Sequence, residues 1–201
     1  MVEHVIFIID ISASVEKYKD TYLNTINNII EYQRKLFPQS HITIATFNHN
    51  HDFYCINQKV VNINLPTITS SGCTAIYDNV IAIINRMKKF SDIQKSDSPL
   101  VIILTDGVDN CSAKTNERLL WLQITMTRAY GWKYIYLGTS ENSMETGKNI
   151  GCNACVLYET TEQSFKEVVN VVGYLMKEKV KENVDIDIRE ITNNMERVNI
   201  N

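Results

Sequence analysis

The sequence predicts an α/β protein in which helices cover both faces of a mostly parallel β-sheet. Residues 5–9 and 100–104 are short, uninterrupted apolar runs, which suit strands that are buried on both faces of a parallel sheet. Segments with apolar residues at helical spacing alternate with further strand-like segments along the chain. Strands that alternate with helices in this way form a parallel sheet through helical crossovers.

The individual elements follow from these patterns. Apolar or β-branched runs bounded by turn residues predict strands at 5–9, 41–47, 52–57, 100–104, 133–137 and 154–158. Apolar residues at helical spacing predict helices at 16–36, 76–87, 113–130, 142–150 and 161–180. Pro38 ends the first helix because proline disfavours a helical residue before it. The turn at 48–51 favours a hairpin of the second and third strands.

The composition fits one globular domain. The chain has 201 residues, of which 44% are hydrophobic, and a net charge of -3. A slightly acidic chain is not typical of nucleic-acid binders, which present a basic surface. No apolar run approaches the ~18 residues of a membrane span. We therefore expect neither nucleic acid nor membrane as a partner.

The ends of the chain and the cysteines bear on its location and domain limits. The N-terminus lacks the features of a signal peptide, and the five cysteines are scattered. We therefore expect a cytoplasmic protein with reduced thiols. Residues 1–180 are expected to form the domain. Residues 181–201 are expected to be a flexible tail or a segment that docks on a partner, since they carry only a thin apolar stripe: Ile188, Ile191, Met195 and Val198.

Polar side chains follow the two most apolar strands where each strand ends. Asp10 ends the first run and precedes Ser12 and Ser14, and Asp106 follows the fourth predicted strand. Thr74 lies between them in sequence, at a junction of loop and helix. Because open α/β sheets place ligands at the carboxyl ends of their strands, we expect these loops to converge at one edge. Oxygen ligands without His or Cys suit Mg²⁺, Mn²⁺ or Ca²⁺ rather than zinc.

These pieces, Asp-x-Ser-x-Ser, a lone Thr and Thr-Asp-Gly, resemble the metal-ion-dependent adhesion site of a von Willebrand factor A domain. The resemblance covers roughly residues 3–180 and is closest to small stand-alone bacterial or phage-type A domains, which have a Gly-Trp-aromatic strand like the one at Gly131-Trp132-Lys133-Tyr134. It implies a Rossmann-like three-layer α/β/α sandwich. The implied strand order is 3-2-1-4-5-6, with the third strand antiparallel at the edge.

The resemblance also implies a ligand set and a function. Ser12, Ser14 and Thr74 would bind Mg²⁺ through their hydroxyls, with Mn²⁺ or Ca²⁺ as alternatives. Asp10 and Asp106 would act mainly through water, or one of them directly, depending on the state. Neutral ligands leave such a cation incompletely neutralised, so its open position favours a Glu or Asp of a partner protein. The implied function is a divalent-metal-dependent protein-binding module without catalysis of its own.

Other interpretations of the same residues stay open. Asp10 and the serines would serve only as helix caps if no metal binds. A Mg²⁺-dependent phosphatase or phosphotransferase would use Asp10 as a nucleophile. Enzymes of the haloacid-dehalogenase type, however, have a second acid two positions later, where this chain has Ser12. The third alternative is a structural or assembly subunit that binds partners without metal.

Three further motifs carry weaker signals. His49-x-His51 is expected to be a solvated turn, which lies at the edge of the candidate site if the second strand runs parallel to the first. Cys152-x-x-Cys155 lacks the second pair that a zinc site needs. Asp109 and Asn110 are expected to shape the rim of the site rather than to bind metal.

Overall fold

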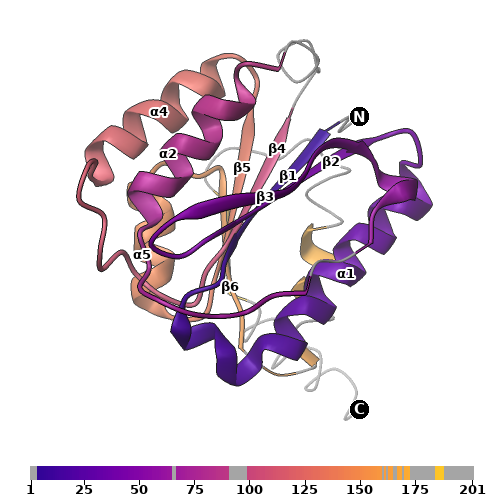
Figure 1. The fold of residues 1–201 in the computed structure, drawn as a ribbon, viewed down its shortest axis with the longest axis horizontal. Helices are drawn as coiled ribbons and strands as arrows, with labels where there is room; N and C mark the ends of the chain where they lie inside the picture. Colours follow the sequence, from indigo (N-terminus) through magenta and orange to yellow (C-terminus); the bar gives the residue numbers. More distant parts are fainter. Residues whose placement is uncertain are drawn as a thin grey trace, which may run out of the picture.

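The computed structural model of the chain contains one seven-stranded sheet in the order β3-β2-β1-β4-β5-β6-β7 (Figure 1). The strands are β1 His4–Asp10, β2 His41–Phe47, β3 His51–Lys59, β4 Leu100–Leu104, β5 Lys133–Gly138, β6 Ala154–Leu157 and β7 Val184–Asp187. The structure describes residues 4–64, 67–90, 99–159, 161, 163–164, 167–168, 170–172 and 184–187.

The predicted strand order is confirmed for the first six strands. β1 pairs in parallel with β2 on one side and with β4 on the other, and β3 lies antiparallel to β2 at the edge of the sheet. The parallel pairing continues from β4 through β5 to β6. β7 extends the sheet within the segment expected to be a tail, because it pairs in parallel with β6. The rest of that segment lies outside the described residues.

Helices cover both faces of the sheet, as predicted. Those whose bounds the structure describes are η1 Ala13–Tyr18, α1 Lys19–Leu36, η2 Val60–Asn62, α2 Ile76–Met87, α4 Glu117–Ala129 and α5 Glu141–Asn149. α2, α4 and α5 lie on one side of the sheet in Figure 1, and α1 lies on the other. The molecule is therefore a three-layer α/β/α sandwich of the Rossmann type.

The side chains of β1 show why two hydrophobic cores form. Alternate residues of a strand point to opposite faces. Phe7 is buried in the core beneath α1, whereas Ile6 and Ile8 are buried in the core beneath α2 and α4. All seven residues of β1 are buried. This double burial fixes the end of β1, and with it the position of Asp10.

Some predicted boundaries move for local reasons. The first helix begins as the 3₁₀ turn η1 before α1, so it starts earlier than predicted. The helix predicted at 113–130, α4, starts at Glu117 because the Asn116 side chain accepts a hydrogen bond from the Leu119 N–H and caps it. Of the stripe predicted for 161–180, Val168 and Val172 are described, and both are buried. Phe165, Val169, Leu175 and Met176 lie outside the described residues.

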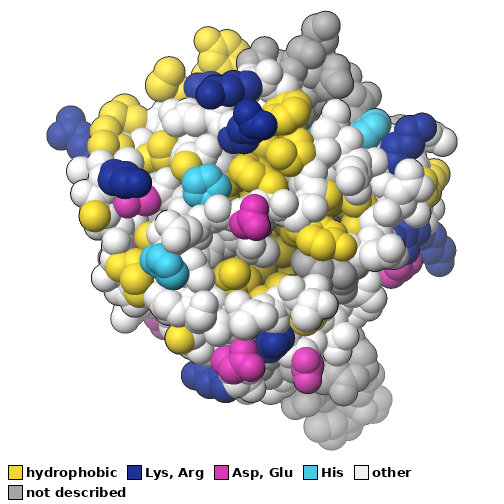
Figure 2. All heavy atoms as spheres, in the orientation of Figure 1, with side chains coloured by type: hydrophobic (Ala, Val, Ile, Leu, Met, Phe, Trp, Pro, Cys, Tyr) yellow, Lys and Arg dark blue, Asp and Glu magenta, His cyan; other side chains and the backbone are white. Residues whose placement is uncertain are grey.

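The surface shows no extended basic area on the face in Figure 2, where the Lys and Arg side chains of the described residues lie mostly around the margin. Within the same part of the chain, no helix is both long and apolar enough to cross a bilayer. The outer side of α4 carries large, partly exposed apolar side chains: Leu119, Trp121, Leu122 and Met126.

Candidate metal centre

The ends of β1 and β4 bring Asp10 and Asp106 to the same edge of the sheet. Ile9 pairs with Leu104 in the parallel register, so the residues that follow these two strands are neighbours. Asp10 has no exposed surface, whereas Asp106 is partly exposed. The predicted convergence of the two carboxylates is therefore confirmed, with Asp10 the deeper of the two.

Both carboxylate oxygens of Asp10 accept hydrogen bonds. The Ser12 N–H donates to Oδ1 at 2.7 Å, and the Thr105 hydroxyl donates to Oδ2 at 2.7 Å. Burial raises the pKa of Asp10 to about 6, although these hydrogen bonds act in the opposite direction. The neighbouring charge of Asp106 adds a smaller upward contribution to the pKa. A cation at this site would favour the ionised carboxylate.

The two serine hydroxyls form a short chain of contacts that leads to Asp106. Ser12 Oγ lies 3.1 Å from Ser14 Oγ, and the Ser14 hydroxyl donates to Asp106 Oδ1 at 2.9 Å. Ser12 occupies the N-cap position of η1, but its side chain makes no capping hydrogen bond. The helix-cap interpretation therefore does not account for the Ser12 hydroxyl, which takes part in the cluster instead.

Thr74 enters the same region from the loop before α2. Its side chain is buried, and a Cβ added to Gly107 would lie 3.9 Å from the Thr74 hydroxyl oxygen. The Thr74 N–H donates to Asn110 Oδ1 at 2.9 Å, and the Asn110 N–H donates to the Thr74 carbonyl at 2.9 Å. This pair of hydrogen bonds fixes Thr74 against the loop that follows β4.

Backbone hydrogen bonds also join the serine loop to the Thr74 loop. The Ala13 N–H donates to the Gly72 carbonyl at 3.0 Å, and the Ser71 N–H donates to the Ile11 carbonyl at 2.9 Å. Gly72 has a φ of 74°, and a Cβ there would lie 2.5 Å from the His49 ring. Only glycine fits this position without movement of its neighbours.

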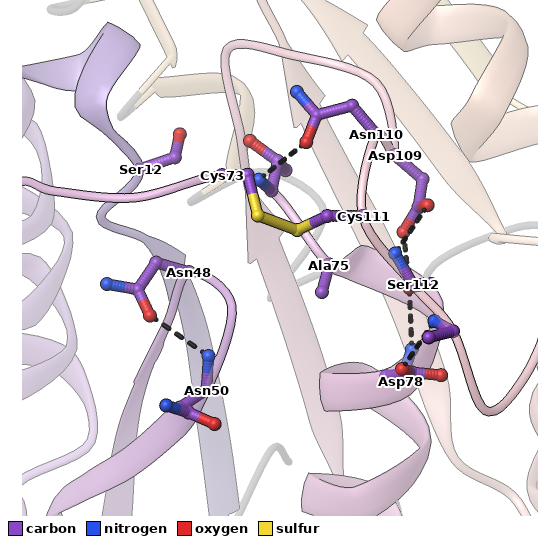
Figure 3. The surroundings of a disulfide bond; sticks show 12 residues. Ser12, Asn48, Asn50, Cys73, Ala75, Asp78, Asp109, Asn110, Cys111 and Ser112 are labelled. Atoms are coloured by element: carbon purple, nitrogen blue, oxygen red, sulfur yellow. Dashed lines mark hydrogen bonds between the residues drawn. A yellow bond between two sulfur atoms is a disulfide. The ribbon is translucent and has the colours of Figure 1, made fainter.

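A disulfide between Cys73 and Cys111 connects the same two loops (Figure 3). The expectation that all five cysteines are reduced is therefore wrong for this pair. The two residues lie 38 positions apart in the sequence, and only the fold brings their Cα atoms to 6.1 Å. Cys55, Cys152 and Cys155 are buried thiols outside any disulfide, as expected.

The solved structures that the fold of this chain resembles include von Willebrand factor A domains. The SpRpn10 VWA domain matches with a TM-score of 0.62 at 10% identity, covering 92% of this chain and 99% of that chain. The chain has the von Willebrand factor A fold. A von Willebrand factor type A protein from Catenulispora acidiphila matches with a TM-score of 0.57 at 13% identity, over 86% of this chain and 42% of that one.

A third A domain is VWA2, an ArnB paralog from Sulfolobus acidocaldarius. It matches with a TM-score of 0.51 at 17% identity, over 70% of this chain and 36% of that one. This chain thus spans less than half the length of the two longer A-domain proteins. No family model and no curated protein matches the sequence. At these identities the likeness establishes the fold and leaves the site to be judged on its own residues.

The donor set at this edge of the A-domain fold suits a hard divalent cation. Among the described residues, no group of three or more His, Cys, Asp or Glu side chains is arranged to hold a metal ion. The candidate site depends instead on hydroxyl oxygens together with two carboxylates. Mg²⁺, Mn²⁺ and Ca²⁺ prefer such oxygen donors, so the residues present fit the metal that the sequence predicts.

The rim residues hold the loop after β4 against the start of α2. Asp109 accepts hydrogen bonds from the Tyr77 N–H at 3.2 Å and from the Ser112 hydroxyl. Asp78, in the first turn of α2, accepts from the N–H groups of three successive residues, Ala113, Lys114 and Thr115. Burial would raise the pKa of Asp78, but these donors outweigh it and lower the pKa. The predicted rim role of Asp109 and Asn110 agrees with these contacts.

Sequence reasoning missed three contributors to the site. Thr105 is noted in the sequence only as part of Thr-Asp-Gly, yet its hydroxyl supports Asp10. Asp78 resembles any acidic residue at a helix start, and its loop contacts depend on the fold. The disulfide was missed because nothing in the spacing of Cys73 and Cys111 signals it.

The two weaker motifs form no metal site among the described residues. His51 Nδ1 lies 3.0 Å from Asn79 Oδ1, while His49 lies beside Gly72. Because β2 is parallel to β1, this turn does lie at the edge of the candidate site. Cys152 and Cys155 are buried beside β5 and α5 and remain separate thiols.

Proposed function

We propose that this chain is a divalent-metal-dependent protein-binding module. Asp10, Ser12, Ser14, Thr74 and Asp106 would hold Mg²⁺, with Mn²⁺ or Ca²⁺ as alternatives. A partner protein would present a Glu or Asp carboxylate to the metal. The site would have no catalytic role of its own.

The observation that carries this proposal is the cluster of oxygens at the sheet edge. Ser14 Oγ lies 3.1 Å from Ser12 Oγ and 2.9 Å from Asp106 Oδ1, so it links the two residues by hydrogen bonds. The Ser12 side chain makes no capping hydrogen bond to η1, and Ser14 lies in the first turn of η1. Thr74 approaches from a second loop. A divalent cation would bind such a cluster of hard oxygen donors, and bonds to the metal would replace the hydrogen bonds among them.

The residues of the proposed site have different roles. Asp10 is buried and orients the serine loop through the Ser12 N–H, so it supplies negative charge beneath the hydroxyls. Ser14 is exposed and Asp106 is partly exposed, so both would face the partner. A bound divalent cation with mostly neutral ligands supplies an open coordination position that favours a hard anion such as a carboxylate.

The geometry favours binding over the phosphatase alternative. Asp10 has no exposed surface, and both of its carboxylate oxygens accept hydrogen bonds at 2.7 Å. A nucleophilic aspartate needs an oxygen that can approach the phosphorus atom of its substrate. The arrangement of Asp10 suits a buried supporting charge better than a nucleophile.

The test is a thermal unfolding series in EDTA, Mg²⁺, Mn²⁺ and Ca²⁺. A metal that binds only the folded state raises the melting temperature as its concentration rises. We expect this response in the wild type and its loss in the Ser12→Ala/Ser14→Ala variant. That variant removes two hydroxyls but keeps the Ser12 N–H that supports Asp10. Asp20→Asn, an exposed acidic position on α1, is the matched control and should respond like the wild type.

The partner is then captured in Mg²⁺ and compared with capture in EDTA. Capture that depends on Mg²⁺, and that an amide in place of one Glu or Asp of the partner abolishes, supports the carboxylate proposal. If the wild type does not respond to millimolar metal, the proposal is wrong. The exposed apolar side chains of α4 would then become the surface on which to seek a partner.

A further inference from the structure

The Cys73–Cys111 disulfide lies directly beside residues that position the proposed metal site. Cys73 precedes Thr74, and Cys111 follows Asn110, whose side chain and N–H both bind the Thr74 backbone. The disulfide and the two hydrogen bonds therefore connect the same pair of loops (Figure 3). The loop that carries Asp106 is thus joined covalently to the loop that carries Thr74.

The remaining cysteines differ from this pair in exposure. Cys73 and Cys111 are partly exposed, whereas Cys55, Cys152 and Cys155 are buried. Burial also raises the pKa of Cys55 and of Cys152, which leaves little reactive thiolate at either residue. A reductant in solution can therefore reach the Cys73–Cys111 disulfide, while the other three cysteines are shielded from thiol–disulfide exchange with it.

We propose that the Cys73–Cys111 disulfide is a redox-sensitive positioning element of the metal site. In the oxidised protein it holds Thr74 beside the Asp106 loop, and the site binds divalent cations with its full affinity. In the reduced protein the two loops separate more easily, and the affinity falls. This inference rests on the proposed function, because it concerns the affinity of the same site.

The chemical change is a two-electron exchange. When the disulfide forms, the thiols of Cys73 and Cys111 lose two protons and two electrons, which reduce one molecule of a disulfide oxidant such as glutathione disulfide to two thiols. Reduction by dithiothreitol runs the other way: the S–S bond breaks, two cysteine thiols form, and dithiothreitol becomes a cyclic disulfide. Each direction passes through a mixed disulfide, for which the partial exposure of both cysteines leaves room.

The expected effect is a weakening of metal binding and not its loss. The hydrogen bonds between Thr74 and Asn110 persist without the disulfide and keep the loops near each other. Residues that orient metal ligands change metal affinity by about 10- to 100-fold when they are removed. We expect reduction to raise the Mg²⁺ concentration needed for half of the melting-temperature response about tenfold.

The experiment titrates Mg²⁺ into oxidised and dithiothreitol-reduced wild-type protein and follows the melting temperature. Thiols are counted separately in denaturant, with three expected in the oxidised protein and five after reduction. The Cys73→Ser/Cys111→Ser variant should match the reduced wild type and should not respond to dithiothreitol. Cys55→Ala, which alters a buried free thiol, should behave like the wild type in both states.

The outcomes separate the two proposals. A lower affinity only in the reduced wild type and in the double variant supports the redox role. Equal titrations for oxidised and reduced protein overturn the redox role while leaving the metal site intact. A lack of metal response in the oxidised protein overturns the metal site, and the redox role with it. If glutathione disulfide leaves five thiols, the pair does not form and the inference is wrong. Circular dichroism confirms that the double variant is folded.

Discussion

The two halves of the proposed metal site are held in place in different ways. The strand-end half, formed by Asp10, Thr105 and Asp106, lies directly at the ends of β1 and β4, whose pairing fixes its backbone. The clamped half is Thr74 together with the loop before α2 and the loop after β4. Long loops carry this half, and they are joined by the Cys73–Cys111 disulfide and the hydrogen bonds of Asn110.

The difference is also energetic. The strand-end half buries a carboxylate, which is unfavourable in its ionised form without a cation. The clamped half is held by interactions that stabilise the fold. Closing a loop of 38 residues with a disulfide stabilises a protein by about 4 kcal/mol in the chain-entropy model. The sheet thus positions the strand-end half at some cost in stability. The disulfide and the hydrogen bonds of Asn110 position the clamped half and stabilise the fold.

The largest effect that we predict is a pH dependence of stability, which arises from the burial of Asp10. Burial raises the pKa of Asp10 from 3.8 to about 6, so the folded state binds more protons than the unfolded state between these values. The stabilising contribution of Asp10 to the free energy of unfolding is therefore fully present below pH 4 and is lost as the pH rises to 6. The loss amounts to roughly 3 kcal/mol in the metal-free protein.

His4, at the other end of β1, acts in the opposite direction and masks this effect. Burial lowers the pKa of His4 from 6.5 to about 4, so stability from this group is lost as the pH falls from 6.5 to 4. We expect the two contributions to offset each other in the wild type. In EDTA, the free energy of unfolding of His4→Gln should fall by roughly 3 kcal/mol as the pH rises from 4 to 6. Over the same rise, the free energy of unfolding of Asp10→Asn should increase by a similar amount. Urea unfolding at each pH measures both, and parallel pH profiles for all three proteins would contradict the prediction.

The strand-end half was predictable because its position depends on the sheet. A fully apolar run ending in an acidic residue indicates a buried strand with Asp10 at its carboxyl end. Neighbouring parallel strands place such ends together. Likewise, Ser12 and Ser14 alternate along the chain, so both were included in the candidate site. The sheet order of the first six strands was predicted from the family resemblance.

The clamped half was only partly predictable because it depends on contacts between distant loops. Thr74 was included from its place at a junction of loop and helix, and its ligand role from the resemblance, but its hydrogen bonds to Asn110 join residues 36 positions apart. Asp78 contacts residues 35 to 37 positions away. No local pattern specifies which loop such a carboxylate meets. The same reason hid the Cys73–Cys111 pairing and the pairing of β7 with β6.

The next prediction weakens the clamped half without touching a proposed metal ligand. Asp78 accepts hydrogen bonds from three backbone N–H groups and from the Thr115 hydroxyl. We expect Asp78→Ala to lower the free energy of unfolding by about 2 kcal/mol, since hydrogen bonds to charged groups contribute about 1.5–3 kcal/mol and water can replace some of them here. Urea unfolding provides the measurement.

Asp20→Ala is the matched control, because Asp20 is also an acidic residue in the first turn of a helix. It is exposed, and we expect its substitution to change stability by about 0.5 kcal/mol or less. Equal losses in the two variants would mean that Asp78 acts only as a helix-start charge and that the loop after β4 does not depend on it.

The smallest effect concerns the point where the two halves meet. The Gly72 carbonyl accepts the Ala13 N–H, and Gly72 combines a φ of 74° with a close approach to His49. We expect Gly72→Ala to lower the free energy of unfolding by about 1–2 kcal/mol from the left-handed backbone alone. Contact of the new methyl group with the His49 ring should add to this loss.

A double-mutant cycle separates these two contributions. His49 is exposed, so His49→Ala alone should have little effect on the free energy of unfolding. In the Gly72→Ala/His49→Ala variant, the part of the loss caused by the ring should be recovered, and the backbone part should remain. Gly131→Ala, at another glycine of positive φ, gives the backbone contribution away from the site. If the double variant recovers nothing, the His49 ring moves aside freely, and the junction of the two halves is held by backbone conformation alone.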